Sequence, residues 1–294
     1  MFDVTVVPWL YPDSWKDNTL EVIARKFSSQ VEILHTSGGK RLYSGENLHR
    51  LVYNKAYLAS MFQVIPQPLG KKVLEIGCSD GMVCDIFALS GAAKVTGVDV
   101  MKTAGCSFPG ENLEYHAMDA AQLTFEDKSF DMVYSIATLE HVPDPYQVLT
   151  EILRVTQIGG HAYIQVGPLY HTPFGHHMFA YFQDYPWIHL RKSKDELIDF
   201  VKANGMDKKI ESDLSMSCEE YIIGMLSRDH VNGLFLKDYR LDEFMKRKDI
   251  QVLKYNVSYE GRDILTPQIA SEITGFDPKR LVEHGFELAF KRIS

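Results

Sequence analysis

Residues 72–84 read Lys-Val-Leu-Glu-Ile-Gly-Cys-Ser-Asp-Gly-Met-Val-Cys, and they carry the clearest structural signal in the chain. The apolar beginning predicts a short buried strand, and the residues from Met82 onward predict a helix with Asp80 as its cap. Gly77 and Gly81, which lie between the two, can adopt positive φ and let the backbone approach a ligand closely. The start of such a helix offers unpaired N–H groups and a partial positive charge to an anion.

A second signal lies about 20 residues after Gly77, where the predicted strand 94–99 ends in Asp99. Nucleotide-binding α/β domains place at this position the carboxylate that binds ribose hydroxyls. The two segments together therefore predict a nucleotide site at the carboxyl ends of two parallel strands.

The motif Glu-x-Gly-Cys-Ser-Asp-Gly differs from the dinucleotide motif G-x-G-x-x-G. It resembles motif I (E/D-x-G-x-G-x-G) of class I S-adenosylmethionine-dependent methyltransferases, with Ser79 at the position of the middle glycine. The resemblance extends over residues 70–167 and is closest to the branch that includes ubiquinone-type and sugar methyltransferases. It implies S-adenosyl-L-methionine as cofactor and S-adenosyl-L-homocysteine as product.

Strands and helices alternate regularly after residue 72, which predicts an α/β fold. The resemblance implies a Rossmann-like seven-stranded sheet, parallel with an antiparallel last strand. We expect an N-terminal helical cap (1–69), an S-adenosylmethionine-binding core (70–167), an inserted lid or substrate-binding region after strand five (168–248), and C-terminal strands that complete the sheet (249–294). A helix over 145–156, closed by Gly159-Gly160, is expected to lead into the fifth strand of the core, 161–166.

The resemblance also implies which residues hold the cofactor. Glu75 orders the loop and water around its methionine end, Asp99 takes the ribose, and Asp119 and the backbone N–H of Ala120 contact the adenine. The full expected set lies at or just after strand ends: Glu75, Gly77, Cys78, Ser79, Asp80, Gly81, Asp99, Val100, Asp119, Ala120 and Ser135.

Methyl transfer to an oxygen requires a base, because a neutral hydroxyl is a poor nucleophile. Histidine is suited to this task near pH 7, and His141 follows the fourth predicted strand, where sugar-methylating relatives place such a base. The loop after strand five holds His171, His176 and His177. We favour His176 and His177 there, because Gly175 gives the backbone room to turn inward; each of these rings has a purely structural alternative.

Quinone-pathway relatives bind a metal through a Glu-His pair and a glutamate three residues before it. That position is Ala137 in this chain, so no metal site is expected. We predict O-methylation of a sugar or another hydroxylated small metabolite. Two alternatives stay open: N- or C-methylation of a small molecule by positioning alone, and a non-catalytic binding protein with a methyltransferase-like fold.

Composition narrows the class of partner. The chain has 294 residues, 45% of them hydrophobic, and a formal net charge of −8, which argues against a nucleic-acid binder. Its four cysteines have no C-x-x-C spacing and no apolar run reaches the length of a membrane span. We therefore expect a cytoplasmic enzyme with free thiols and a small-molecule acceptor, and the sequence does not predict an oligomeric state.

Overall fold

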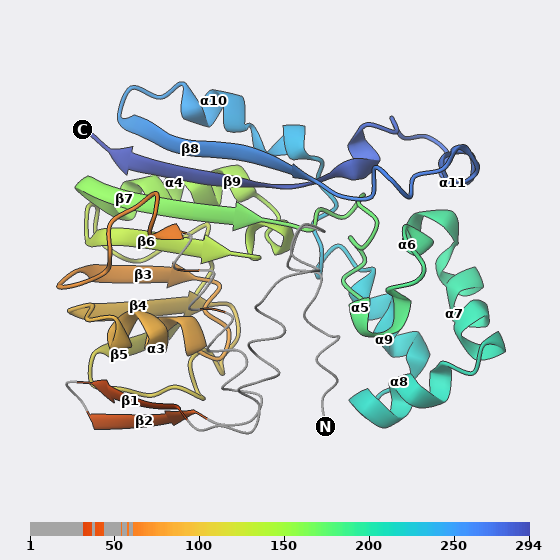
Figure 1. Cartoon of the computed structure of the whole chain (residues 1–294), viewed down its shortest axis with the longest axis horizontal. Helices are drawn as coiled ribbons and strands as arrows, with labels where there is room; N and C mark the ends of the chain where they lie inside the picture. The colour runs from red at the N-terminus through yellow and green to blue at the C-terminus, as the bar shows by residue number, and fades with distance from the viewer. Residues whose placement is uncertain (1–31, 37–38, 44–53, 55–57, 59–60) are drawn as a thin grey trace.

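A computed structural model describes residues 32–36, 39–43, 54, 58 and 61–294. A seven-stranded sheet in the order β5-β4-β3-β6-β7-β9-β8 forms its centre (Figure 1). A separate antiparallel pair consists of β1 (Glu32–Thr36) and β2 (Gly39–Tyr43). The strands of the large sheet are β3 (Lys72–Ile76), β4 (Lys94–Asp99), β5 (Leu113–Ala117), β6 (Phe130–Ile136), β7 (Thr156–Val166), β8 (Ile250–Tyr259) and β9 (Glu283–Arg292).

Strand direction in the sheet confirms the predicted fold class. The pairs β3–β4, β4–β5, β3–β6 and β6–β7 are parallel, whereas β9 is antiparallel to both β7 and β8. The chain runs from β3 outward to β5 and then returns to β6 on the other side of β3. This reversal makes a topological switch point at the carboxyl ends of β3 and β6, which is where sheets of this kind bind ligands in a crevice.

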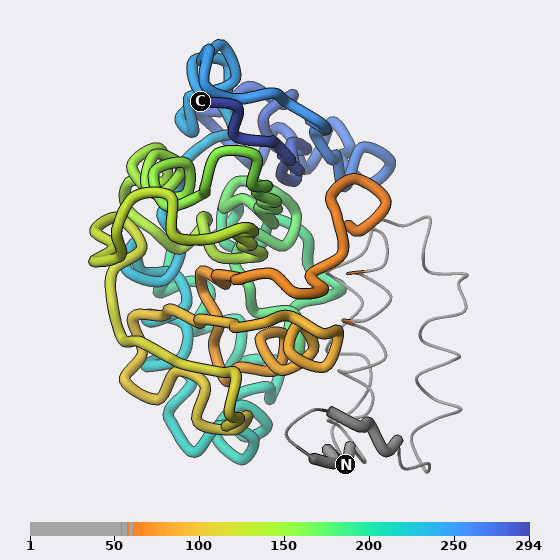
Figure 2. Tube along the Cα trace, turned by 90° about the vertical axis from the view of Figure 1, so that its left-hand side faces the viewer, coloured from red at the N-terminus to blue at the C-terminus, as the bar shows by residue number. Residues whose placement is uncertain are grey.

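Two hydrophobic cores cover the two faces of the sheet. Val73, Met132 and Tyr134 pack with α3 (Met82–Leu89), whereas the alternate residues Leu74 and Val133 pack with α4 (Pro145–Val155). The alternation follows from the two-residue period of a strand. Figure 2 shows α3 and α4 on opposite sides of the strands.

Five helices lie together beyond the carboxyl ends of β6 and β7 (Figure 1). They are α5 (Phe179–Phe182), α6 (Ile188–Arg191), α7 (Lys194–Ala203), α8 (Asp207–Leu214) and α9 (Cys218–Met225). Their buried residues, among them Phe182, Leu197 and Ile222, form a core of their own. Capping boxes at Ser193 and Ser217 fix the starts of α7 and α9.

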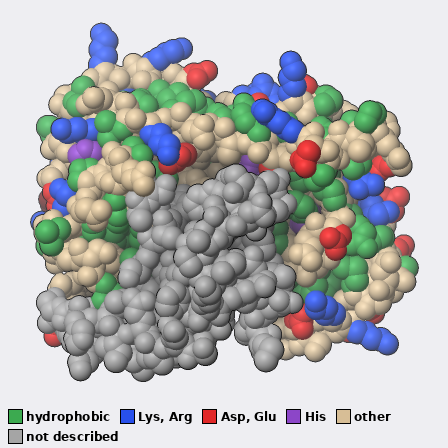
Figure 3. All heavy atoms as spheres, in the orientation of Figure 1, with side chains coloured by type: hydrophobic (Ala, Val, Ile, Leu, Met, Phe, Trp, Pro, Cys, Tyr) green, Lys and Arg blue, Asp and Glu red, His purple; other side chains and the backbone are tan. Residues whose placement is uncertain are grey.

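The remaining described elements are short. They are the helices α10 (Leu241–Met245) and α11 (Pro267–Glu272), and the 3₁₀ turns η4 (Leu139–His141), η5 (Leu236–Tyr239) and η6 (Arg280–Val282). None of the helices in the described part of the chain is long and apolar enough to cross a membrane. On the face in Figure 3, the coloured Lys and Arg side chains are interspersed with Asp and Glu.

The structure differs from the sequence-based expectations in three places. The N-cap of α3 is Gly81 and not Asp80, although Asp80 Oδ1 accepts a hydrogen bond from Met82 N at 3.3 Å. Helix α4 ends at Val155, and Gly159-Gly160 belong to β7, where the register with β6 shifts. The strands β1 and β2 were not predicted, and most of the predicted N-terminal cap lies outside the described residues.

Candidate functional site

The loop between β3 and α3 has the backbone that its glycines predicted. The φ angles are 79° at Gly77, 47° at Ser79 and 93° at Gly81, so serine accommodates the turn at the middle position. The N–H groups of Gly77 and Cys78 both donate to the Val98 carbonyl, at 2.8 and 3.0 Å, which folds the loop over β4.

Only glycine fits at position 77. A Cβ there would lie 2.1 Å from Oγ1 of Thr138, which belongs to the segment after β6. The loop after β3 and the segment after β6 therefore touch at the mouth of the crevice, and Gly77 allows this close approach.

Asp99 at the end of β4 holds the same loop. Its Oδ2 accepts a hydrogen bond from Ser79 N at 2.9 Å, and its Oδ1 accepts one from Met101 N at 3.0 Å. An ionised carboxylate has about four lone-pair sites, so Asp99 retains acceptor capacity for a ligand. The neighbouring Val100 is 75% exposed.

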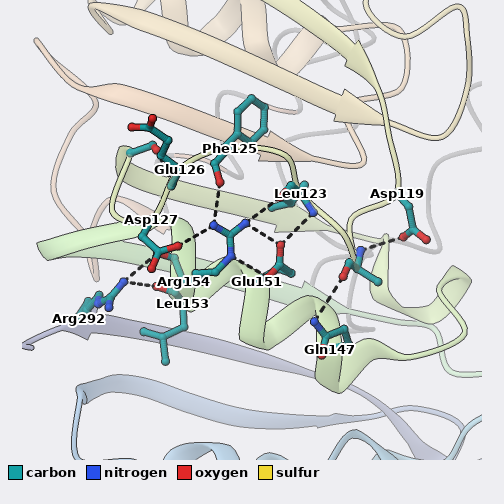
Figure 4. Close-up of polar contacts among 12 residues, drawn as sticks. Asp119, Leu123, Phe125, Glu126, Asp127, Gln147, Glu151, Leu153, Arg154 and Arg292 are labelled. Atoms are coloured by element: carbon teal, nitrogen blue, oxygen red, sulfur yellow. Dashed lines mark hydrogen bonds and ion pairs between the residues drawn. The ribbon is translucent and has the colours of Figure 1, made fainter.

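Asp119 and Ala120 follow β5 on a segment that is fastened to α4 (Figure 4). Asp119 Oδ1 accepts a hydrogen bond from Ala121 N at 2.8 Å, and Glu151 Oε2 accepts one from Leu123 N at 2.9 Å. Arg154 donates to the Leu123 carbonyl at 2.8 Å and pairs with Glu151. These contacts fix the position of the exposed Asp119 at the crevice.

Three members of the expected cofactor set lie beneath these loops. Cys78 is 3% exposed, and Ser135 is fully buried with its hydroxyl donating to the Ile76 carbonyl at 3.2 Å. Glu75 is 5% exposed, and its Oε2 accepts a hydrogen bond from the Cys84 thiol at 3.0 Å. Burial raises the pKa of Glu75 to about 8, so this carboxyl is mostly protonated at neutral pH in the ligand-free chain.

The structure brings two of the predicted histidines together. The rings of His141, in η4 after β6, and His177, in the loop after β7, have centroids 5.0 Å apart. His230, which follows α9, lies 5.2 Å from His141 and 5.9 Å from His177. His230 was not predicted, because nothing in its local sequence distinguishes it from other loop histidines.

The other two histidines of the loop after β7 lie elsewhere. His176 is fully buried among aromatic rings, and its Nδ1 accepts a hydrogen bond from Met178 N at 2.9 Å. His171 stacks on Phe235 with ring centroids 3.7 Å apart. His176 is thus separated from the group that contains His141 and His177.

Asn232 fastens the segment after α9 to η4. Its Nδ2 donates to the carbonyls of Leu139 and Val142, both at 2.9 Å, and Asn232 N donates to the Glu140 carbonyl at 2.8 Å.

Burial lowers the pKa of His141, while the hydrogen bond to the His230 carbonyl and the charge of Asp99 oppose this shift. The turn η4 begins directly after Thr138, whose Oγ1 donates to the Ile76 carbonyl at 3.2 Å, so His141 follows a segment that touches the end of β3.

Comparison with known proteins identifies the core. Residues 74–164 match the family model described as "Methyltransferase domain". The ubiquinone biosynthesis O-methyltransferase of Vibrio atlanticus is 37% identical over 106 residues, which cover 32% of this chain and 42% of that protein. The enzyme of the same name from Pseudomonas fluorescens (strain Pf0-1) is 36% identical over 101 residues, with 32% and 43% covered. The chain thus spans less than half the length of these curated relatives.

Solved structures show similarity of the same kind. An S-adenosylmethionine-dependent methyltransferase from Mesorhizobium loti is 25% identical with a TM-score of 0.37, over 40% of this chain and 56% of that one. One from Methanosarcina mazei is 17% identical with a TM-score of 0.41, over 80% and 97%. The family match and the strand order agree with the motifs: residues 74–164 form a methyltransferase domain of the S-adenosylmethionine-dependent class I fold, as the sequence predicted.

Proposed function

We propose that this protein is a methyltransferase that transfers the methyl group of S-adenosylmethionine to a hydroxyl oxygen of a small metabolite, such as a sugar. The observation that carries the proposal is the meeting of His141 and His177 at the crevice that Gly77 and Asp99 border. The names of the curated relatives support an oxygen acceptor.

The residues at the crevice fit the methyl donor. The loop of Gly77, Ser79 and Gly81 has the backbone needed for close approach, Asp99 retains lone pairs for ribose hydroxyls, and Asp119 is exposed beside Ala120. When bound, S-adenosylmethionine supplies a methyl group already activated on a sulfonium. The chain therefore has to hold the two reactants in line and exclude water.

We assign the acceptor side of the crevice to the imidazoles of His141 and His177. An imidazole nitrogen that accepts a hydrogen bond from the acceptor hydroxyl orients the oxygen lone pair and receives the proton. The oxygen forms the new C–O bond, and the electron pair of the S–CH₃ bond remains on sulfur. His176, which is enclosed by aromatic rings, is the weaker candidate for this role.

We propose that residues 168–248 form the wall of the acceptor site. The helices α5 to α9 have their own core beyond the strand ends, and Asn232 fastens the chain that follows them to η4 beside His141. Rings such as Phe179, which lies 5.7 Å from His177, would then contact the apolar face of an acceptor.

Calorimetry with S-adenosylhomocysteine and a transfer assay with labelled S-adenosylmethionine test the proposal. We expect product binding and label transfer to members of a panel of sugars and phenols. His141→Ala should reduce transfer to oxygen by at least about a hundredfold, in the range of general acid–base contributions. His116→Ala, which removes a half-buried histidine of β5 outside the group of His141 and His177, is the matched control. Transfer to amines alone, unaffected by His141→Ala, would favour N-methylation, and absence of product binding would favour a non-catalytic protein.

A further inference from the structure

From the geometry of His141, His177 and His230 we infer a binding site for a divalent transition-metal ion of the zinc type, which the sequence did not predict. One ring nitrogen from each of these three residues lies within 4.8 Å of the other two. Only the role of the ion rests on the proposed function. The binding site itself depends only on the positions and contacts of the three histidines.

The hydrogen bonds of two rings determine which nitrogens are free. His141 Nδ1 contacts the His230 carbonyl, and His177 Nε2 lies 3.0 Å from the Pro168 carbonyl. Because a carbonyl oxygen only accepts, each of these nitrogens carries the proton. The lone pairs in the neutral rings are therefore on His141 Nε2 and His177 Nδ1.

This arrangement is the one that metal-binding histidines adopt in proteins. One ring nitrogen donates to a backbone carbonyl or carboxylate, which fixes the tautomer, and the other binds the ion. His230 adds a third nitrogen, because its Nε2 is buried and has no hydrogen-bond partner. A buried polar atom without a partner is costly, and an ion would satisfy it.

The separations of the ring nitrogens require only a small movement of the three side chains to bind one ion. Zinc–nitrogen bonds are about 2.0–2.1 Å long, so two nitrogens on a tetrahedral ion lie about 3.4 Å apart. The widest separation that the structure allows within the cluster is 4.8 Å, so the rings need to approach by at most about 1.4 Å. Small side-chain rotations supply this movement.

Three imidazoles favour zinc-type ions over magnesium or calcium, which prefer oxygen ligands. Glu140, next to His141, is not part of the cluster: its carboxylate is buried and accepts a hydrogen bond from Gly167 N at 3.3 Å. The site therefore differs from the Glu-Glu-His arrangement considered from the sequence and shares with it only His141.

A tetrahedral ion with three protein ligands keeps one open position. The segment that leads into η4 touches the loop after β3, because Thr138 Oγ1 donates to the Ile76 carbonyl at 3.2 Å and lies against Gly77. This contact puts His141 next to the proposed donor site. A hydroxyl bound at the open position has its pKa lowered, loses its proton to water and presents an alkoxide for methylation. With the ion bound, the histidines serve the acceptor through the ion; in the metal-free chain their free ring nitrogens take the proton, as proposed above.

A second group within the described residues could compete for a metal, namely Glu211, Cys218 and Glu219. Glu219 is already paired with Lys202, which holds its pKa near 2. This pairing makes the second group the poorer ligand set, and Glu219→Gln isolates its contribution.

The test is metal binding by the full chain, measured without any methyl acceptor. After removal of bound metal with a chelator, we expect one equivalent of Co²⁺ to bind and to give the visible absorption of four-coordinate cobalt. His230→Ala should weaken Co²⁺ binding by more than about a hundredfold, since loss of an outer partner alone costs 10- to 100-fold. His116→Ala and Glu219→Gln should bind Co²⁺ as the wild type does.

S-adenosylhomocysteine binding, measured by calorimetry on the same samples, separates the two proposals. His230→Ala should retain it, which shows that the variant is folded. Absence of Co²⁺ uptake by the wild type, uptake that survives both His177→Ala and His230→Ala, or loss of uptake in Glu219→Gln would overturn the metal site. Failure of S-adenosylhomocysteine to bind while Co²⁺ binds as described would overturn the proposed function and leave the site standing.

Discussion

Replacing Glu75 by glutamine should flatten the pH dependence of stability. Folding raises the pKa of this carboxyl from 4.5 to about 8, chiefly through burial. The native chain therefore holds a proton that the unfolded chain releases between these two pH values. The stability that this proton provides is fully present below about pH 4.5 and is lost as the pH rises through about 8.

The expected size follows from proton linkage. One proton bound by the native state and absent from the unfolded state changes the free energy of unfolding by about 1.4 kcal/mol per pH unit. Between about pH 5.5 and about pH 7.5, the wild type should lose roughly 3 kcal/mol more than Glu75→Gln. Burial also raises the pKa of Glu140 to about 8. The contribution of Glu140 to the pH dependence is the same in both proteins, so it cancels in the comparison.

Glutamine is the appropriate replacement because its side-chain oxygen can accept the hydrogen bond that the Cys84 thiol donates to Glu75. Urea unfolding at a series of pH values gives the two stability curves, and the exposed Glu126→Gln controls for the loss of a surface carboxylate. Parallel curves for the wild type and Glu75→Gln would refute the reasoning, because they would mean that Glu75 titrates alike in both states.

Three further outcomes follow from the same contacts. Binding of S-adenosylhomocysteine, whose amino-acid end carries an ammonium group, should release a proton from the wild type and less from Glu75→Gln. Calorimetry in buffers of different ionisation enthalpy measures this difference. Gly77→Ala should weaken S-adenosylhomocysteine binding at least about tenfold and destabilise the chain. The reason is that the new Cβ would lie 2.1 Å from Thr138 Oγ1, on a backbone with a φ of 79°. Unchanged affinity in calorimetry would contradict this expectation. Arg154→Met should cost about 1–3 kcal/mol in urea unfolding, because it removes the donor to the Leu123 carbonyl, and a loss within error would show that the carbonyl finds another donor.

The parts of the site that the sequence predicted depend on local chemistry. The turn after β3 followed from Gly77 and Gly81, whose positive φ angles the structure confirms. The helix that was expected over 145–156 begins at Pro145, where Asp144 caps it by accepting a hydrogen bond from Gln147 N. The strands β8 and β9 lie within the C-terminal segment, 249–294, that was expected to complete the sheet.

The parts that were missed depend on the path of the chain through space. His230 lies beside His141 because Asn232 bonds to η4 across some ninety positions of sequence, and no local pattern encodes this contact. Gly159-Gly160 were interpreted as a helix end, a role that glycine often has, but they lie within β7, at the point where its register with β6 shifts. The burial of Ser135 likewise depends on its neighbour β3, whose carbonyl takes its hydroxyl.

The position of β9 in the sheet has a consequence for the order in which the fold is completed during synthesis. Strand β8 is made before β9, yet in the described sheet its only partner is β9, which inserts between β8 and β7. Until β9 emerges, β7 has an open edge and β8 has no sheet to join, and such edges promote aggregation. Nascent chains that stop short of Glu283 should therefore depend on chaperones, although they already contain every residue assigned to the crevice.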